Sequence, residues 1–325
     1  MAKAACLITG GSGFIGTHLI EYLLKEDRFS KIYVLDLRKP SSACNIVEYL
    51  NCDINYPVSI EKLSNCDTCY HLAALCKEPG YNWDEYFITN HIGTKNVCEL
   101  AERIGINNII FTSTMMVFRA GDIRNNEEAL TAPDTAYGMS KLSAELMLKE
   151  WVAKSTRRRF RIVRPGVVFG RGESANFTRL YNALKKHRFA YMGRKETVKG
   201  CVYVKDLVRF LDFVTDDHFD RTTYNFVYPN ALTIEDICNS MVEVFEFNKR
   251  IPVIPYKLAL LGGYLFEILF ELGLKTSIHH RRIQKLYYST DISADPAMET
   301  GFKLNYSLKE ALLDWQKDCL PNELY

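Results

Sequence analysis

The chain has 325 residues, of which 47% are hydrophobic and 25% are charged, and its 41 Lys and Arg residues nearly balance its 39 Asp and Glu residues. This composition is typical of a folded globular protein and excludes a disordered chain or a fibrous repeat. The formal net charge of +2 provides no global field for nucleic acid, so we expect no nucleic-acid partner. The length favours one large domain with a smaller lobe.

The N-terminus runs directly into a strand-like stretch, without an apolar segment and cleavage site, so we expect no signal peptide. The ten cysteines are then expected as thiols in a reducing compartment, which indicates a cytoplasmic protein. Cys66 and Cys69 form a CxxC pair, but no second pair at metal-ligand spacing accompanies them, so we predict no metal site. No apolar run reaches the roughly 18 residues that a transmembrane helix needs.

Up to about residue 170, short apolar or β-branched runs alternate with helical stretches, which is typical of βαβ units and a parallel sheet. In chain order, the expected elements are strand Ala5–Thr9, helix Thr17–Leu24, strands Lys31–Asp36, Ile46–Asn51 and Thr68–Leu72, helix Ile92–Ile104, strand Asn108–Thr112, helix Tyr137–Lys154 and strand Phe160–Arg164. The central strands are continuously apolar, as expected for a sheet covered on both faces. After Pro165 the pattern loosens, and we expect residues 167–325 to form mainly a second lobe, with some segments rejoining the sheet.

A glycine-rich turn, Gly10-Gly11-Ser12-Gly13-Phe14-Ile15-Gly16, follows the first expected strand and opens the first helix. In this context one glycine makes a tight turn, one lets the backbone approach a pyrophosphate, and one packs the helix against the strand. The helix N-terminus adds free N–H groups and the positive end of its dipole. The turn therefore predicts a dinucleotide site.

Asp36 lies about 20 residues after the turn, where a carboxylate accepts hydrogen bonds from the adenosine ribose. Such a carboxylate repels a 2′-phosphate, so it favours NAD over NADP. Arg38, two residues later, keeps NADP open as the alternative, because its guanidinium could pair with that phosphate.

Tyr137 and Lys141 are four residues apart, which places both side chains on one face of an expected helix. A free phenol is only about one part in a thousand ionised at neutral pH. A neighbouring ammonium and a positive nicotinamide can stabilise the phenolate inside a dry site. We therefore interpret Tyr137 as a base and Lys141 as the cation that activates it. A hydroxyl is expected nearby, after a strand, and Thr114 with Ser113 beside it fits that place.

These residues and three further motifs resemble the extended short-chain dehydrogenase/reductase family, which includes NAD-dependent sugar epimerases and dehydratases. The further motifs are His71-Leu72-Ala73-Ala74, Asn90 with Gly93-Thr94-Lys95-Asn96, and Arg164-Pro165-Gly166. The resemblance covers nearly the whole chain. It implies an α/β fold with a Rossmann-type doubly wound parallel sheet in residues 1–166, which bind NAD and carry the catalytic residues. A smaller α/β substrate lobe is implied mainly in residues 167–325.

The resemblance also implies a role for individual residues. The implied catalytic residues are Thr114, Tyr137 and Lys141. The residues implied to bind NAD are Gly10, Gly13, Phe14, Ile15, Gly16, Asp36, Asp53, Ile54, Leu72, Ala73, Ala74, Asn90, Lys141 and Pro165, with Asp53 placed against the adenine. The residues implied to bind substrate are Ser113, Thr114, Asn176, Lys199 and Arg281.

The residues after Thr114 discriminate between reactions of the family. The 4,6-dehydratases carry an acidic pair there and the 3,5-epimerase-reductases a cysteine, whereas this chain has Met115 and Met116, which transfer no protons. We therefore expect a 4-epimerase of a diphosphate-linked hexose or N-acetylhexosamine, acting in polysaccharide or glycoconjugate synthesis. A dehydrogenase or ketoreductase of a sugar or sterol-like alcohol is the alternative enzyme. A binding protein that only senses NAD is the alternative from another class.

Residues 255–285 combine the apolar run Leu258–Phe266 with a following basic group, a pattern that can lie on an anionic membrane surface. The other interpretation is a helix packed on the lobe, with the basic residues serving substrate phosphates. This helix and Lys199 resemble a subgroup that epimerises N-acetylglucosamine on polyprenyl diphosphate. UDP-sugars and lipid-linked sugars therefore both stay open as substrates. Family analogy also suggests a homodimer.

Overall fold

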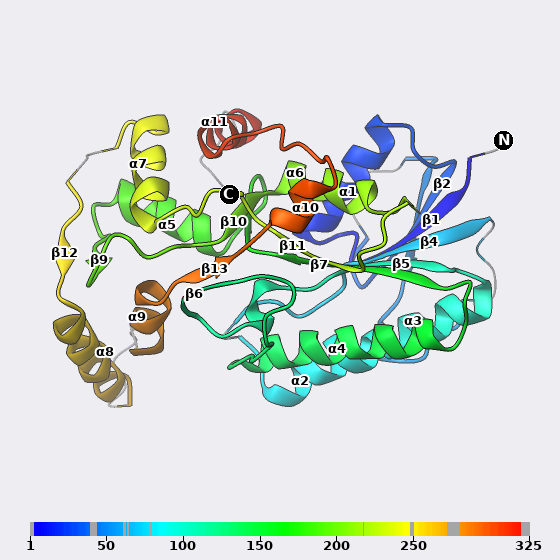
Figure 1. Cartoon of the computed structure of the whole chain (residues 1–325), viewed down its shortest axis with the longest axis horizontal. Coiled ribbons are helices and arrows are strands. Elements are labelled where there is room, and N and C mark those ends of the chain that lie inside the picture. The colour runs from blue at the N-terminus through cyan, green and yellow to red at the C-terminus, as the bar shows by residue number, and fades with distance from the viewer. Residues whose placement is uncertain are drawn as a thin grey trace.

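The structure is a computed structural model that describes residues 3–39, 44–60, 63, 65–78, 80–216, 218–247, 250–271 and 280–319 (Figure 1). The side chains of residues 267–271, 281 and 282 lie outside this description. Up to residue 165 the elements are β1 (Ala5–Thr9), α1 (Phe14–Lys25), β2 (Lys31–Asp36), β3 (Val47–Asn51), β4 (Cys66–His71), α2 (Trp83–Phe87), the π-helical turn η1 (Ile88–Ile92), α3 (Gly93–Ile104), β5 (Asn108–Thr112), the 3-10 turn η2 (Met115–Val117), β6 (Gly121–Asn125), α4 (Ala136–Ala153) and β7 (Arg159–Pro165). The later elements are β8 (Val167–Phe169), α5 (Asn176–Lys185), β9 (Tyr191–Met192), β10 (Cys201–Tyr203), α6 (Val204–Phe213), β11 (Thr223–Phe226), α7 (Ile234–Val244), β12 (Val253–Ile254), α8 (Tyr256–Glu271), α9 (His280–Tyr287), β13 (Thr290–Ile292), α10 (Asp295–Glu299) and α11 (Leu308–Cys319).

The central sheet has seven parallel strands in the order β3-β2-β1-β4-β5-β7-β11. The chain runs outward from β1 through β2 to β3 and then returns to the other side of β1 with β4. This reversal places a switch point between β1 and β4, where open α/β sheets bind ligands outside the carboxyl ends of the strands. The expected Rossmann-type doubly wound sheet is confirmed.

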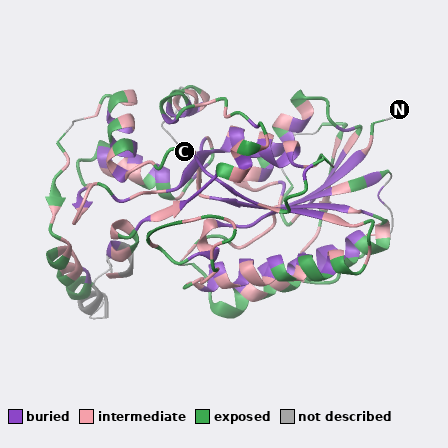
Figure 2. Cartoon of the chain, in the orientation of Figure 1, coloured by how far each residue is buried: buried purple, intermediate pink, exposed green. Residues whose placement is uncertain are grey.

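Both faces of the sheet are buried, as the apolar strands predict. In β1, Cys6 and Ile8 belong to the core cluster on the side of α1 and α6, whereas Ala5 and Leu7 belong to the cluster on the side of α3 and α4. Figure 1 shows these helices in layers above and below the sheet, and Figure 2 shows the strands as the buried centre of the molecule. Successive side chains of a strand point to opposite faces of the sheet, so one apolar strand contributes to the core on each face.

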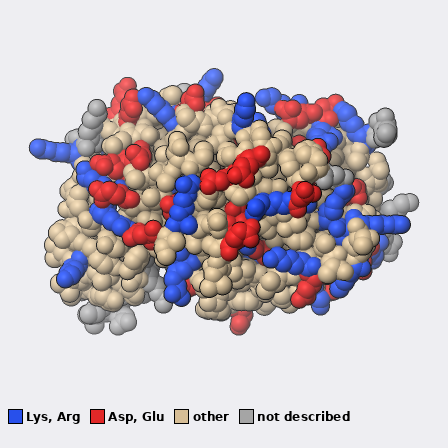
Figure 3. All heavy atoms as spheres, in the orientation of Figure 1, with Lys and Arg blue, Asp and Glu red and all other residues tan. Residues whose placement is uncertain are grey.

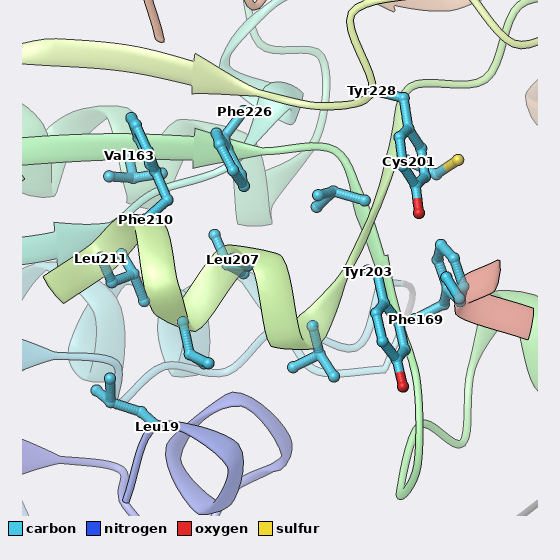
Figure 4. Packing of buried hydrophobic residues seen from close by; sticks show 14 of the residues in the cluster. Leu19, Val163, Phe169, Cys201, Tyr203, Leu207, Phe210, Leu211, Phe226 and Tyr228 are labelled. Atoms are coloured by element: carbon cyan, nitrogen blue, oxygen red, sulfur yellow. The ribbon is translucent and has the colours of Figure 1, made fainter. Parts of the chain in front are cut away.

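A segment of the second half of the chain joins the main sheet. β11 pairs in parallel with β7 at the edge of the sheet, and α6 packs on α1. Figure 4 shows α6 against the sheet: the ring of Phe210 stacks on that of Phe226 with centroids 4.2 Å apart, and Leu207 and Leu211 lie on the same buried side. Burying a side chain of this size contributes about 2 kcal/mol, so these contacts hold the later segment firmly to the sheet.

Most expected elements agree with the structure to within one residue at each end, but two start earlier. The strand expected at Thr68–Leu72 begins at Cys66, because its pairing with β1 extends that far. The helix expected at Thr17–Leu24 begins at Phe14, because Gly13 serves as its N-cap directly after the glycine turn.

The helix expected at Ile92–Ile104 is the last part of a longer helical run. The run starts with α2 at Trp83 and passes through η1 into α3. Asn82 caps its start and forms a capping box with Glu85. The Glu85 carboxylate accepts a hydrogen bond from the backbone N–H of Asn82 at 2.7 Å. Sequence analysis missed this cap because no apolar periodicity follows it directly.

The remaining strands form three short parallel pairs: β8 with β10, β9 with β12, and β6 with β13. The first pair packs against α5, α6 and α11, whereas β9 contacts α9. The pairing of β6 with β13 ties the segment before α4 to the segment after α9. Among the helices described, none is long and apolar enough to cross a bilayer.

Candidate active site

The glycine turn between β1 and α1 has no room for larger residues. Gly10 has φ +73°, and a Cβ there would lie 2.7 Å from backbone atoms of Ala73. A Cβ on Gly16 would lie 2.4 Å from the carbonyl oxygen of Gly10. Gly13 is the N-cap of α1, and none of the described side chains caps this helix end. The N–H groups of the first turn are therefore left for an anion, which fits the pyrophosphate of a dinucleotide.

Asp36, at the end of β2, lies beside this turn. Its carboxylate accepts the backbone N–H of Ser12 at 3.0 Å and that of Arg38 at 2.9 Å. The guanidinium of Arg38 in turn donates to the carbonyl oxygen of Ser12 at 3.3 Å. The Asp36 carboxylate and the Arg38 guanidinium, which both affect the choice between NAD and NADP, thus lie together at the predicted ribose position. Backbone N–H groups fix the orientation of the carboxylate.

The other residues predicted to bind the cofactor lie around the same edge of the sheet. They are Phe14 and Ile15 at the start of α1, Asp53 and Ile54 after β3, Leu72, Ala73 and Ala74 at the end of β4 and beyond, and Pro165 at the end of β7. Carboxyl ends of parallel strands meet at one edge, so these residues surround the switch point. The residues present therefore fit a bound dinucleotide.

The three predicted catalytic residues come together from two elements. α4 carries Tyr137 and Lys141 one helical turn apart, and Thr114 follows β5. Thr135 caps α4 by accepting the N–H of Gly138 at 3.1 Å, which fixes the turn that holds Tyr137. The hydroxyl of Thr114 lies beside the phenol of Tyr137 and favours its ionised form. Their exposed fractions are 7% for Thr114, 9% for Tyr137 and 1% for Lys141.

Burial sets the protonation of this group. It raises the pKa of Tyr137 above that of a free phenol, and the hydrogen bond from Thr114 opposes the increase. Burial also lowers the pKa of Lys141 to about 7, against the attraction of the Glu145 carboxylate. An additional positive charge in the site favours the phenolate of Tyr137, and an oxidised nicotinamide ring has that charge.

His71, at the end of β4, is a neutral neighbour of this group. Thr94 Oγ1 donates to the carbonyl oxygen of Asn90 at 2.6 Å, so it accepts from His71 Nε2 at 2.9 Å. His71 Nδ1 then accepts from Thr9 Oγ1 at 2.7 Å. Burial lowers the pKa of His71 to about 3, and the charge of Lys141 lowers it further. The imidazole therefore joins the end of β1 to α3 without adding charge.

Asn90 was predicted to contact the cofactor, and its side chain makes hydrogen bonds within the protein. It is 1% exposed, accepts the N–H of Leu75, and donates to the carbonyl oxygen of Leu75 and to Ser140 Oγ. Ser140 Oγ donates onward to the carbonyl oxygen of Tyr137 at 2.8 Å. Both amide hydrogens are thus occupied, and Asn90 connects the loop after β4 to the catalytic turn of α4.

Ser113 also differs from its predicted role in binding substrate. Its side chain is 3% exposed, and its Oγ donates to Glu145 Oε1 at 2.5 Å. Ser113 thus bonds a carboxylate two turns beyond Tyr137 on α4, whereas Thr114 lies beside the phenol itself. Of the two neighbouring hydroxyls, only that of Thr114 reaches Tyr137.

The predicted phosphate-binding residues are more scattered. Lys199 Nζ donates to the carbonyl oxygens of Lys285 and Tyr288, both at 2.6 Å, so it binds the end of α9 instead of a solvated surface. Burial lowers the pKa of Lys199 to about 7. Asn176 is exposed at the first position of α5. The side chain of Arg281 lies outside the described residues.

Sequence analysis missed three neighbours of the catalytic residues. Cys76 is close enough to affect the pKa values of both Tyr137 and Lys141. The rings of Tyr86 and Tyr137 have centroids 6.2 Å apart. Glu145 is one turn beyond Lys141, and this spacing is the signal that could have identified it.

The CxxC pair lies in the core. Cys66 and Cys69 are both buried in β4, and burial raises the pKa of Cys66 to about 12. Within the described part of the chain, no three His, Cys, Asp or Glu side chains are grouped so that they could hold a metal ion.

The chain is similar to known proteins. The chain is 30% identical over 312 residues to N-acetyl-alpha-D-glucosaminyl-diphospho-ditrans,octacis-undecaprenol 4-epimerase of Escherichia coli O157:H7, covering 94% of this chain and 92% of the relative. It is 29% identical over 181 residues to a decarboxylating sterol-4-alpha-carboxylate 3-dehydrogenase of Saccharomyces cerevisiae, covering 51% and 52% of the two chains.

Solved structures share the fold. UDP-glucuronic acid 4-epimerase from Bacillus cereus in complex with NAD has a TM-score of 0.75 at 19% identity, and UDP-N-acetylglucosamine 4-epimerase from Bacillus cereus has a TM-score of 0.73 at 19% identity. Each comparison covers 98% of both chains. The family model of the NAD dependent epimerase/dehydratase family matches residues 6–226. The chain therefore belongs to the NAD dependent epimerase/dehydratase family.

Proposed function

We propose that this protein is an NAD-dependent sugar 4-epimerase whose substrate is an N-acetylhexosamine on a polyprenyl diphosphate. The observation that carries the proposal is the buried group of Thr114 and Tyr137, in which the Thr114 hydroxyl favours the phenolate, with Lys141 one helical turn beyond Tyr137. The 30% identity to the E. coli undecaprenol-linked 4-epimerase over 94% of the chain supports the same reaction and substrate.

We assign the transfer of the sugar hydroxyl proton to Tyr137 and the positioning of the sugar oxygen to Thr114. The phenolate of Tyr137 removes the proton of the sugar 4-hydroxyl, while the hydroxyl of Thr114 holds the same oxygen. Lys141 stabilises the phenolate by its charge. After the sugar has turned in the site, Tyr137 returns the proton to the same oxygen, which then lies on the other side of the ring.

The dinucleotide is assigned to the switch point. The N-terminus of α1 and the glycine turn would hold its pyrophosphate, and Asp36 its ribose hydroxyls. When bound, NAD supplies reversible hydride acceptance at the sugar C4, so the reaction ends with the cofactor in its starting form.

The half-buried residues after Thr114 support epimerisation over dehydration. Met115 and Met116 form η2, and neither side chain can transfer a proton. Elimination of water from C5 and C6 needs an acid and a base at this position, so the site is equipped only for transfer at C4. We assign these steps to residues 1–166 and substrate binding mainly to residues 167–325.

α8 is the reason to favour a lipid-linked substrate over a UDP-sugar. Its exposed side chains are large and apolar: Leu258, Leu261, Tyr264, Leu265 and Phe266 are between 40% and 60% exposed. The surface that α8 occupies in Figure 3 is mostly uncharged, and Lys257 is exposed on the same helix. An apolar face with an adjacent cation matches the interface of an anionic membrane, where a polyprenyl chain lies.

Sedimentation with vesicles tests this contact. We expect the protein to sediment with vesicles that contain phosphatidylglycerol and to be released by high salt. The double variant Leu261→Asp/Leu265→Asp should stay in the supernatant, whereas Leu130→Asp, at an 87% exposed leucine of another segment, should sediment like the wild type. A wild-type protein that stays in the supernatant with these vesicles at low salt contradicts the membrane assignment.

A product assay tests the reaction. The enzyme is incubated with polyprenyl-diphospho-N-acetylglucosamine, UDP-N-acetylglucosamine or UDP-glucose, and the sugars are separated. We expect the N-acetylgalactosamine epimer from the lipid-linked substrate, without accumulation of reduced cofactor. Stoichiometric NADH and a keto product would instead indicate the alternative, a dehydrogenase, and no turnover with bound NAD would indicate a binding protein.

We also propose a homodimer formed through the outer face of α4 and η1. Leu146 of α4 and Ile88 and Ile92 of η1 are exposed on these neighbouring elements. Light scattering should give twice the chain mass for the wild type and a monomer for Leu146→Glu. A monomeric wild type at micromolar concentration contradicts this assembly.

A further inference from the structure

Glu145 is a buried carboxylate that the proposed reaction does not use directly. It lies on α4, one turn beyond Lys141 and two turns beyond Tyr137, and its exposed fraction is 0%. Burying a carboxylate costs several kcal/mol unless its charge is compensated. The contacts of this carboxylate therefore indicate what it does in the site.

Arg164 compensates the charge of Glu145. Its Nε donates to Oε1 at 2.8 Å and its Nη2 to Oε2 at 2.6 Å, which is a bidentate pair. Arg164 is itself 4% exposed, and its guanidinium lies over the ring of Phe118 with 5.2 Å to the centroid. Because β7 holds the guanidinium, the carboxylate has one fixed orientation relative to the sheet.

The same carboxylate holds the end of β5. Ser113 Oγ donates to Glu145 Oε1, and Thr114 follows in an extended conformation with φ −159° and ψ 151°. In this conformation a side chain fixed on one side of the strand fixes the direction of the next side chain. The bond from Ser113 thus directs Thr114 toward Tyr137.

Several groups surround the ammonium of Lys141. Glu145 approaches from α4, His71 from β4, Cys76 from the loop after β4, and Phe111 from β5. His71 is neutral, and desolvation of its sulfur raises the pKa of Cys76, although the residue is exposed. Of these neighbours, the Glu145 carboxylate is the anion that favours the ammonium form of Lys141, and Arg164 offsets part of its charge.

We propose that Glu145 is a positioning residue whose carboxylate, anchored by Arg164, keeps Lys141 charged. Through Ser113 the same carboxylate presents Thr114 to the phenol. This inference rests on the proposed function for its kinetic consequences, and its electrostatic part stands on the buried position of Glu145 one helical turn from Lys141 and on its attraction for the ammonium. Burial lowers the pKa of Lys141 to about 7, which leaves the ammonium sensitive to the loss of one neighbouring charge.

The variant Glu145→Gln separates charge from shape. We expect the alkaline limb of kcat/KM against pH to move to lower pH by about one unit or more, because an opposite charge at this range shifts a pKa by that amount. At a fixed pH above the limb, the rate then falls about tenfold for each unit. An alkaline limb that stays at its wild-type pH, whatever the loss in kcat, overturns the proposal.

Ser113→Ala is the matched control. It removes the bond to the carboxylate and leaves the charge, so we expect a lower kcat with the alkaline limb in its wild-type position. If Ser113→Ala moves the limb as far as Glu145→Gln does, the charge is not the cause, and the proposal is wrong.

A measurement without substrate keeps the inference separate from the proposed function. In protein labelled with carbon-13 at the lysine side chains, the Lys141 signal is assigned by Lys141→Arg and titrated by NMR. We expect its midpoint to lie at lower pH in Glu145→Gln than in wild type. An equal midpoint refutes the electrostatic role, whereas a wild type without epimerase activity refutes only the proposed function.

The single variant leaves Arg164 without its partner, which can prevent folding. The double variant Glu145→Gln/Arg164→Met removes both charges and keeps the volume. Lys141 still loses its neighbouring anion, but the loss of the Arg164 cation opposes the effect, so a smaller displacement of the titration in the same direction is expected. A wild-type midpoint in the folded double variant contradicts the proposal in the same way.

Discussion

The ammonium of Lys141 lies 3.9 Å from the centroid of the Phe111 ring. The ring face is negative, so it attracts a cation that has left water, typically by about 2 kcal/mol when the pair is desolvated. Phe111 is 0% exposed and belongs to β5, directly before the strand end that carries Thr114. β5 therefore supplies the platform of the catalytic cation, and the segment directly after it supplies the hydroxyl that lies beside the base.

The glycine turn predicts a sharp loss of cofactor binding on substitution. In Gly16→Ala, the added methyl meets the carbonyl oxygen of Gly10, so the turn must move. Overpacking of this kind costs about 1–3 kcal/mol, which corresponds to NAD binding about 5- to 150-fold weaker. Gly121→Ala is the control, because its Cβ would meet no atom within 4 Å. Calorimetric titration with NAD measures both, and equal affinities would place the dinucleotide elsewhere.

Asp36 predicts the cofactor preference. In Asp36→Ser the carboxylate is gone while Arg38 remains next to the turn. We expect NAD binding to weaken about 10-fold, because a hydrogen bond to a charged group is worth about 1.5–3 kcal/mol. Binding of NADP should improve at the same time. An unchanged ratio of the two dissociation constants contradicts the assigned ribose position, and the double variant Asp36→Ser/Arg38→Ala should lose the gain in NADP binding.

Much of this site was predictable because its signals are local. The glycine turn, Asp36 and the pair Tyr137 and Lys141 each depend on spacing along one strand–turn–helix unit or one helix turn. Parallel strands then bring these units to one edge without further information. The location of the site at the carboxyl edge of the sheet can therefore be predicted from the order of the elements.

The contacts that the sequence does not predict are those between distant segments. Lys199 binds carbonyl oxygens of Lys285 and Tyr288, which lie 86 and 89 residues away. Ser113 faces a carboxylate 32 residues later, and Asn90 a hydroxyl 50 residues later. Such partners are set by tertiary packing, and a single sequence contains no periodicity that identifies them.

His71 predicts how stability changes with pH. Its pKa is lowered to about 3 in the folded protein, whereas an unfolded histidine titrates near 6.5. The unfolded chain therefore binds more protons between these values, so the contribution of His71 is complete above pH 6.5 and is lost as the pH falls. From pH 6.5 to 5 the free energy of unfolding should fall through this group, with a slope that steepens toward about 1.4 kcal/mol per pH unit.

Urea unfolding at pH 6.5 and pH 5 measures this slope. His71→Asn should lose less stability over this interval than the wild type, even if it is less stable at both values. His187→Asn, at an exposed position, should keep the wild-type slope. A slope in His71→Asn equal to that of the wild type contradicts a neutral buried imidazole.

The central claim is that the phenolate of Tyr137 accepts the proton of the sugar 4-hydroxyl. The most direct measurement compares turnover and NAD affinity in Tyr137→Phe, which removes one oxygen and keeps the ring beside Tyr86. We predict a rate at least ~1000-fold lower, in line with the loss of a general base, and a dissociation constant for NAD within about threefold of wild type. A variant that binds NAD normally and keeps more than about a tenth of the wild-type rate would show that another group takes the proton.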